Sequence, residues 1–261
     1  MNFDDVTAIQ IPEGNVKSIA IGGVTVWEAP VVDKYTWDAV LASIDAGTYA
    51  TDYAIGDTIP LNFGSTIPYK VGANGVINMQ IAAFDADDLA DGSGKAPITW
   101  ISVECLNGLP MNSKQAEMDE DGTYKDGTGA IGGWEKSELR AYLKDTIKPL
   151  IPETVRNAIK EVTKSQMAYN ASGSSYTQAT TEDVWIPDES EIIDGIYSGL
   201  FPDTNSLVKV DVFNYSAVWW LRSTSGSNQF YYVNGNYGSV ASSGMASYCD
   251  KQNDFAIGFC T

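Results

Sequence analysis

The chain has 261 residues, of which 44% are apolar, and its 34 acidic and 16 basic side chains give a net charge of −18. This length fits one large domain or a domain with a small appendage, and the apolar content argues against disorder. The negative charge repels phosphate backbones and anionic lipid surfaces, so we expect no nucleic-acid partner.

Histidine is absent, which removes Ser-His-Asp and Cys-His catalysis and His-ligated zinc. The three cysteines, Cys105, Cys249 and Cys260, form no CxxC pair. We expect Cys105 to be buried, and a bridge between Cys249 and Cys260 is left open. The sequence has no apolar run of 18 residues and no recognisable signal peptide, so we expect synthesis in a cytoplasm and no membrane insertion.

Residues 1–30 predict a small β unit. Ile9 and Ile11 flank a polar residue, Pro12–Asn15 is a turn signal, and Gly22-Gly23 is a second turn between further β-branched residues. Three such short strands provide too little apolar area to bury a core by themselves. We therefore expect this unit to pack on the main domain, on a sister subunit or on a larger assembly, so that a homo-oligomer such as a trimer is one option.

The remainder, residues 35–261, predicts a single α+β domain with a few helices, many short strands and long loops. The helices are expected at 37–44, 134–143 and 153–161, with Pro149 and Pro152 interrupting the second. Strands are expected within 53–63, 69–84, 98–106 and 183–187, and in the tail at 218–223, 230–233, 237–241 and 255–259. Long loops are expected over 107–133 and 162–178.

The tail is the most informative segment. After an apolar run at Val218–Ser223, no charged side chain occurs between Ser223 and Tyr248, a stretch of 26 residues with seven Ser, four Tyr, four Gly and three Asn. Rigid tyrosines among small hydrogen-bonding residues are typical of binding surfaces, whereas a catalytic site is expected to carry strongly titratable groups. The tail therefore favours recognition over catalysis, and recognition without charge predicts weak salt dependence.

Strand alternation selects the candidate binding residues. If Val233 belongs to the core, Tyr231 shares its face, and Phe230 and Tyr232 point outward. A slip of one residue would exchange Tyr231 and Tyr232, so both are kept. The predicted ligand-binding residues are Asn228, Phe230, Tyr231, Tyr232, Asn234, Asn236, Tyr237, Ser239, Ser242, Ser243, Met245, Ser247, Tyr248 and Asp250.

Other features have simpler interpretations. Trp219 and Trp220 are expected in the core, and Arg222 in a structural salt bridge or carbonyl contact. The acidic loop 119–127 offers oxygen ligands for calcium, but it lacks the Glu at position 12 of an EF-hand, so a solvated loop is favoured and no metal or cofactor is assigned. The carboxylates of Glu182, Asp183, Asp188, Glu189 and Glu191 would allow a pair for glycoside hydrolysis, although in so acidic a chain such pairs arise by chance.

Several segments, in this order, resemble a known family. They are Tyr53–Asp57, Lys95–Ile101, the Gly-Gly-Trp helix at Gly132–Leu143, the strand at Asp183–Glu191, and the Trp-Trp-Leu-Arg-Ser run at Trp219–Ser223 followed by Val233–Gly235 and Gly258-Phe259. They resemble C-type-lectin-fold domains of phage tail and bacterial surface proteins, some of which are variable proteins of diversity-generating retroelements, similar in role to the phage major tropism determinant. The chain departs from the pattern at Ile257–Cys260, which lacks the family's Arg and Pro, and the triplets of calcium-dependent sugar binders are missing.

The resemblance implies a C-type-lectin-like fold with two helices, short antiparallel strands and long loops, together with the small N-terminal β appendage. It implies a non-enzymatic receptor-binding protein of a phage or prophage tail. Such a protein would bind a host cell-surface protein or glycan through a C-terminal region diversified over about 215–260, and would attach to the tail through residues 1–30. The alternative that it leaves open is a bacterial surface or secreted adhesin module. Formylglycine-generating enzymes share the lectin fold, but Cys249 and Cys260 do not match their cysteine pattern.

Overall fold

A computed structural model describes residues 18–21, 24–28, 33–64, 75–235 and 246–261. The chain divides into two compact units, Met1–Lys34 and Tyr35–Thr261. In the first unit, β1 (Ser18–Ile21) and β2 (Val24–Glu28) form an antiparallel pair. The predicted strand at Ile9–Ile11 and both predicted turns lie outside the described residues.

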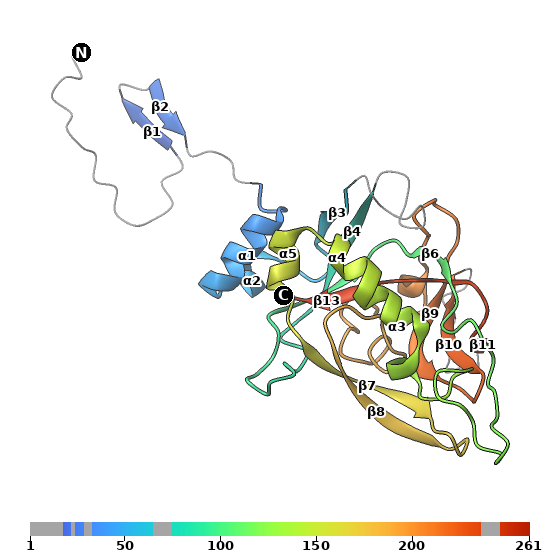
Figure 1. Cartoon of the computed structure of the whole chain (residues 1–261). Helices are drawn as coiled ribbons and strands as arrows, with labels where there is room; N and C mark the ends of the chain where they lie inside the picture. Colours follow the sequence, from blue (N-terminus) through green and yellow to red (C-terminus); the bar gives the residue numbers. More distant parts are fainter. Residues whose placement is uncertain (1–17, 22–23, 29–32, 65–74, 236–245) are drawn as a thin grey trace. The chain divides into compact units, whose positions relative to one another are not determined.

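The second unit is an α+β fold built mainly from antiparallel strands, as its sequence predicts (Figure 1). Its helical segments are α1 (Trp37–Ala46), α2 (Tyr49–Asp52), η2 (Trp134–Lys136), α3 (Glu138–Tyr142), the π-helical η3 (Leu143–Ile147), α4 (Lys148–Leu150), α5 (Glu153–Ala158) and η4 (Asn205–Leu207). Its strands are β3 (Thr58–Asn62), β4 (Val76–Phe84), β5 (Ile98–Ser102), β6 (Leu106–Leu109), β7 (Val162–Tyr169), β8 (Ser175–Glu182), β9 (Val218–Thr224), β10 (Gln229–Asn234), β11 (Ala246–Tyr248), β12 (Asn253–Phe255) and β13 (Gly258–Cys260).

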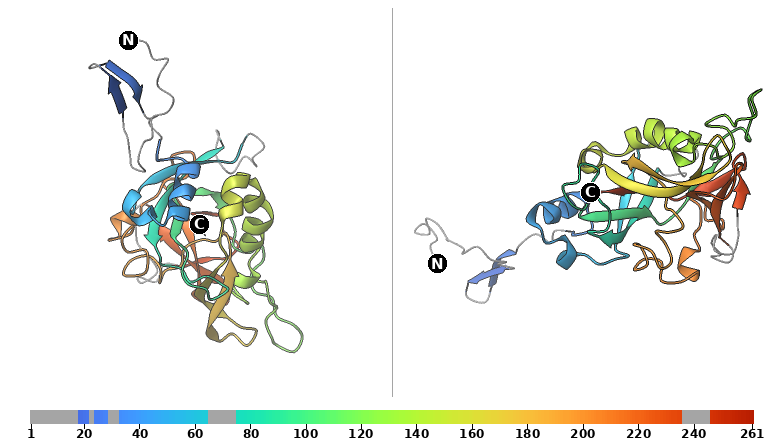
Figure 2. Two further views of the ribbon diagram at one scale, coloured as in Figure 1. Left: turned by 90° about the vertical axis from the view of Figure 1, so that its left-hand side faces the viewer. Right: turned by 90° about the horizontal axis from the view of Figure 1, so that it is seen from below.

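Three sheets organise the described part of this unit. A four-stranded antiparallel sheet has the order β13-β5-β4-β3, a five-stranded sheet has the order β11-β10-β9-β12-β6, and β7 and β8 form a hairpin. In the five-stranded sheet only β12 and β9 run parallel. The strands β10 and β11 lie at the end of the unit away from α1 and α2 (Figures 1 and 2).

Capping residues set the limits of two predicted helices. The hydroxyl of Thr36 accepts a hydrogen bond from the Ala39 N–H at the start of α1, and Gly47 ends this helix with φ 68°, as predicted. The hydroxyl of Ser137 likewise accepts from the Arg140 N–H at the start of α3. The helical run then continues through η3 and α4 past Pro149, contrary to prediction, because this proline lies in the first turn of α4, where a missing N–H costs little.

A hairpin replaces the loop predicted over 162–178. β7 and β8 are paired along their whole length, and the burial of β7 alternates strictly. Two of its buried positions hold the polar Lys164 and Gln166, which are 1% and 3% exposed. The apolar alternation that signals a strand is therefore interrupted at two of its inward positions.

Two other predicted strands are divided differently. The run 98–106 contains β5 and the start of β6, which belong to different sheets, and the run 255–259 contains the end of β12 and the start of β13. Residues 183–187 are mostly buried, as predicted, but they pair only through an isolated bridge between Trp185 and Gly258. Extended chain can thus be buried here without a continuous ladder.

The core is one cluster rich in aromatic rings. Trp100, Trp134, Trp185, Trp219 and Trp220 are all fully buried. Such large side chains each remove much apolar area from water and fix the positions of the surrounding loops.

Candidate functional site: the C-terminal sheet

The start of the tail is scaffold. The indole N–H of Trp219 donates to the Leu207 carbonyl at 3.2 Å, and that of Trp220 donates to the Leu109 carbonyl at 2.9 Å. Both rings are fully buried, so the prediction that they belong to the core is confirmed.

Arg222 is a structural residue, as predicted. It is fully buried, and its guanidinium donates to both carboxylate oxygens of Glu191, at 2.7 and 2.9 Å, to the Ile186 carbonyl and to Gln166. Burial alone would lower the pKa of Arg222, but the paired Glu191 carboxylate outweighs it and raises the pKa. A bidentate pair of this kind fixes geometry as well as charge.

The same carboxylate connects to a second buried ion pair. Lys164 lies 3.1 Å from Glu191 and 2.5 Å from Asp87, and the carboxylate of Asp87 also accepts from the hydroxyls of Thr99 and Tyr197. Burial would raise the pKa values of both carboxyl groups, but their cationic partners hold these values below the usual range. Each oxygen of the two carboxylates has at least two partners. These are the groups named above, the Cys260 thiol for Asp87, and the Asp188 N–H for Glu191.

A cavity of about 280 Å³ borders this network, lined by Asp87, Glu191 and hydroxyl residues of the hairpin. The carboxylates of Asp87 and Glu191 are already satisfied by protein donors, so these two groups offer a ligand few free acceptors. The network therefore stabilises the scaffold beneath the tail. Of the carboxylates considered for hydrolysis, Glu182 and Asp183 are also in ion pairs, with Arg140 and Lys148.

The tail strand β10 departs from simple alternation. Its pairing with β9 shifts between Phe230 and Tyr232, so that Phe230 and Val233, three residues apart, are both fully buried. The prediction that Phe230 points outward is wrong, because an irregularity of this kind reverses the facing of the residues before it. Tyr231 and Tyr232 are both half-buried and pack against the core.

The other described candidates differ in their roles. Tyr248 is 47% exposed, and Asn234 and Ser247 are partly exposed. Asn228 accepts from the Ala116 N–H, and Asp250 accepts from Gln115 at 3.1 Å, so both hold the long loop against the tail. The candidates Asn236, Tyr237, Ser239, Ser242, Ser243 and Met245 lie outside the described residues.

Sequence reasoning did not place Glu189 beside the tail. Burial and the neighbouring Asp188 raise the pKa of Glu189 to about 7, and Glu189 and Asp188 in turn contribute, after burial, to a raised pKa of Tyr231. Asp188 and Glu189 follow Pro187, whose carbonyl accepts from the Arg222 N–H. This tail surface is therefore not free of charge, contrary to the expectation from its local sequence.

The Asp119 and Asp121 carboxylates of the acidic loop 119–127 have partners within the loop itself. Asp121 accepts from the N–H and hydroxyl of Thr123, and Lys125 lies 3.6 Å from Asp119 and 3.7 Å from Glu117. Within the described ranges, no group of three or more Cys, Asp or Glu residues is arranged to hold a metal ion.

All three cysteines are free and buried. Burial raises the pKa of each thiol, that of Cys249 to about 11, with Asp250 adding to the effect. Among the described helices, none is long and apolar enough to span a bilayer.

One comparison with known families matches a region that includes most of the long loop and most of the tail. No curated protein and no solved structure matches the chain. A family model described as a domain of unknown function, DUF6273, matches residues 111–251. This region contains α3, the β7–β8 hairpin, the Arg222 network residues Lys164 and Glu191, and strands β9 to β11. Because the match covers just over half of the chain, the protein belongs to the DUF6273 family.

Proposed function

We propose that this protein is a non-enzymatic receptor-binding protein of a phage or prophage tail, and that it binds a host cell-surface ligand through its C-terminal sheet. One observation carries the proposal. The tail combines fully buried anchors, Trp220 and Arg222, with tyrosine side chains that remain accessible, Tyr231, Tyr232 and Tyr248. Tyrosines on a rigid support bind with a small loss of side-chain entropy.

We further propose a C-type-lectin-like fold for the second unit. Its mainly antiparallel sheets, few helices and long connections are consistent with that fold. The residues that carry the resemblance are also core residues, since Trp134, Trp185, Trp219 and Arg222 are fully buried. Motif residues that form the core are expected where a motif specifies a fold rather than a ligand.

In this proposal the tail surface is the part that varies, and residues 1–30 attach the protein to the tail or to sister subunits. Several copies on one particle would raise weak single-site binding through effective concentration. The buried ion pairs of Arg222 and Lys164 support this proposal, because they hold the scaffold through residues that are not exposed.

Adhesion of tail variants to host bacteria tests the proposal. We expect a full-length Tyr231→Ala/Tyr232→Ala/Tyr248→Ala variant to lose at least about 30-fold in cell binding, since one central tyrosine can contribute about 2 kcal/mol. The control is Tyr35→Ala/Tyr176→Ala, which removes exposed tyrosines outside the C-terminal region. Equal losses in both variants, with both folded by circular dichroism, would refute a tail-specific site.

A further inference from the structure

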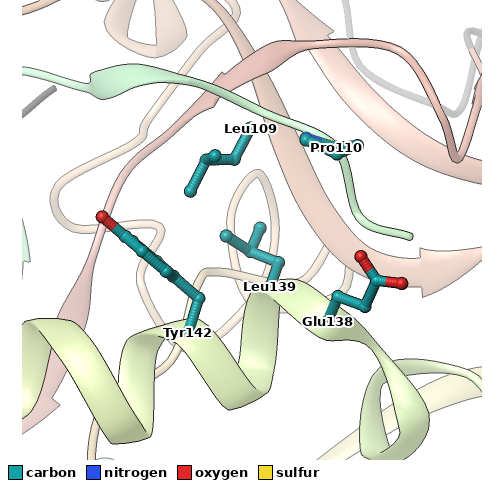
Figure 3. A pocket seen from close by; sticks show the side chains of 5 residues that line it. All are labelled: Leu109, Pro110, Glu138, Leu139 and Tyr142. Atoms are coloured by element: carbon teal, nitrogen blue, oxygen red, sulfur yellow. The ribbon is translucent and has the colours of Figure 1, made fainter. Parts of the chain in front are cut away.

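A pocket of about 270 Å³ lies between strand β6 and helix α3 (Figure 3). Among the described residues it is lined by Leu109, Pro110, Glu138, Leu139 and Tyr142. Figure 3 shows the two leucine side chains between the ring of Tyr142 and the carboxylate of Glu138. The pocket thus has an apolar centre and one anionic end, and its volume is below the usual range of about 300–1,000 Å³ for drug-sized ligands.

The carboxylate of Glu138 is held in place by hydrogen bonds, but no cation among the described residues neutralises its charge. It accepts from the N–H of Ser113 at 3.1 Å and from the hydroxyl of Ser113 at 2.7 Å. Both donors are neutral, and no salt bridge to Glu138 is formed by the lysines and arginines of the described ranges. The exposed Glu138 carboxylate is therefore oriented for a cationic partner from outside.

A second carboxylate of the tail adds to the negative charge at this end. Asp250 directly follows Cys249, whose carbonyl accepts from the same Asn112 that bonds the Glu138 N–H, and both carboxylates raise the pKa of the Cys249 thiol after burial. One oxygen of Asp250 accepts from Gln115, and the other is buried without a partner among the described residues.

Asn112 joins the pocket to the tail. Its side-chain oxygen accepts from the Glu138 N–H at 2.9 Å, while its own N–H donates to the Cys249 carbonyl at 3.1 Å. Asn112 is fully buried, so this connection is rigid. The anionic end of the pocket therefore borders the segment that carries the predicted binding residues Tyr248 and Asp250.

We propose that this pocket binds an arginine side chain of a protein ligand, with the guanidinium against Glu138 and the aliphatic stem over Leu109 and Leu139. Long basic side chains lay their methylene groups on apolar surface, and the planar guanidinium matches a carboxylate better than an ammonium does. The inference rests on the proposed function and sharpens it, because it selects a protein with an exposed basic segment over an uncharged glycan as the host ligand.

The test uses the full-length protein with ¹³C-labelled leucine methyl groups and a capped Gly-Arg-Gly peptide as the probe. We expect the Leu109 and Leu139 methyl resonances to shift with the arginine peptide and not with the isosteric citrulline peptide, which lacks the charge. Glu138→Gln should weaken the arginine peptide at least about 10-fold, consistent with a hydrogen-bonded charge pair. Glu153→Gln removes an exposed carboxylate of another helix and should leave the affinity unchanged.

Equal shifts with both peptides, no shift with either, or equal affinities of the wild type and Glu138→Gln would overturn the arginine pocket. The adhesion assay separates this failure from that of the proposed function. Suppose that the tail tyrosine variant loses adhesion, Glu138→Gln keeps it and the peptides do not bind. The proposed tail site is then supported, and the proposed arginine pocket is refuted. If the tyrosine variant adheres normally, the proposed function fails.

Discussion

Replacement of Arg222 by Met is expected to lower the free energy of unfolding by about 3–5 kcal/mol, because it leaves the buried Glu191 carboxylate without its bidentate partner. Lys164 remains 3.1 Å from Glu191 but must also neutralise Asp87. Urea unfolding followed by tryptophan fluorescence measures the change.

The second substitution Glu191→Leu in the Arg222→Met background should recover part of this loss, since both charges are then removed. The control Lys95→Met breaks an ion pair with Asp88 whose side chains are 45% and 74% exposed, and it should cost less than about 1 kcal/mol. A loss for Arg222→Met no larger than that of Lys95→Met would contradict a structural role for the network.

Gly133→Ala is expected to destabilise the protein by about 3 kcal/mol. Gly133 has φ 58° and ψ −149°, a conformation that essentially only glycine adopts, and strain of this kind costs about 1–3 kcal/mol. A Cβ atom at this position would also lie 2.5 Å from the Ala168 Cβ on β7, which adds overpacking of about 1–3 kcal/mol. The substitution tests whether the start of η2 is packed tightly on the hairpin.

Gly122→Ala is the matched control for Gly133→Ala. Gly122 also has a positive φ, 81°, but nothing lies within 4 Å of its added Cβ. Only backbone strain remains, and we expect a loss of about 1 kcal/mol by urea unfolding. Similar losses at the two glycines would mean that the contact with Ala168 is unimportant.

Local sequence patterns predict the helices and strands whose buried side chains are apolar and recur at helical or strand spacing. Helix α1 follows from its spaced apolar residues and Gly47, and β9 follows from its apolar run with two adjacent tryptophans. Apolar side chains pack in the core without needing one specific partner. Their spacing along the chain is therefore enough to predict these elements.

The elements that were missed depend on distant partners. The β7 strand turns Lys164 inward because Asp87 and Glu191, far away in the chain, neutralise it. The inward turn of Phe230 depends on an irregular pairing with β9, and the charge beside Tyr231 comes from Glu189. Composition alone leads us to propose the tail as the binding site. The orientation of its side chains and the charges around them arise from tertiary contacts, so they could not be predicted from the sequence.

We propose that host binding occurs on the C-terminal sheet while the rest of the unit acts as scaffold. Hydrogen exchange of the full-length protein, free and bound to host cell envelopes, tests it most directly. We expect slowed exchange in peptides covering 229–234 and 246–250, with little change in the β7–β8 hairpin. Slowed exchange in the hairpin or in residues 208–215, with an unchanged tail, would contradict it.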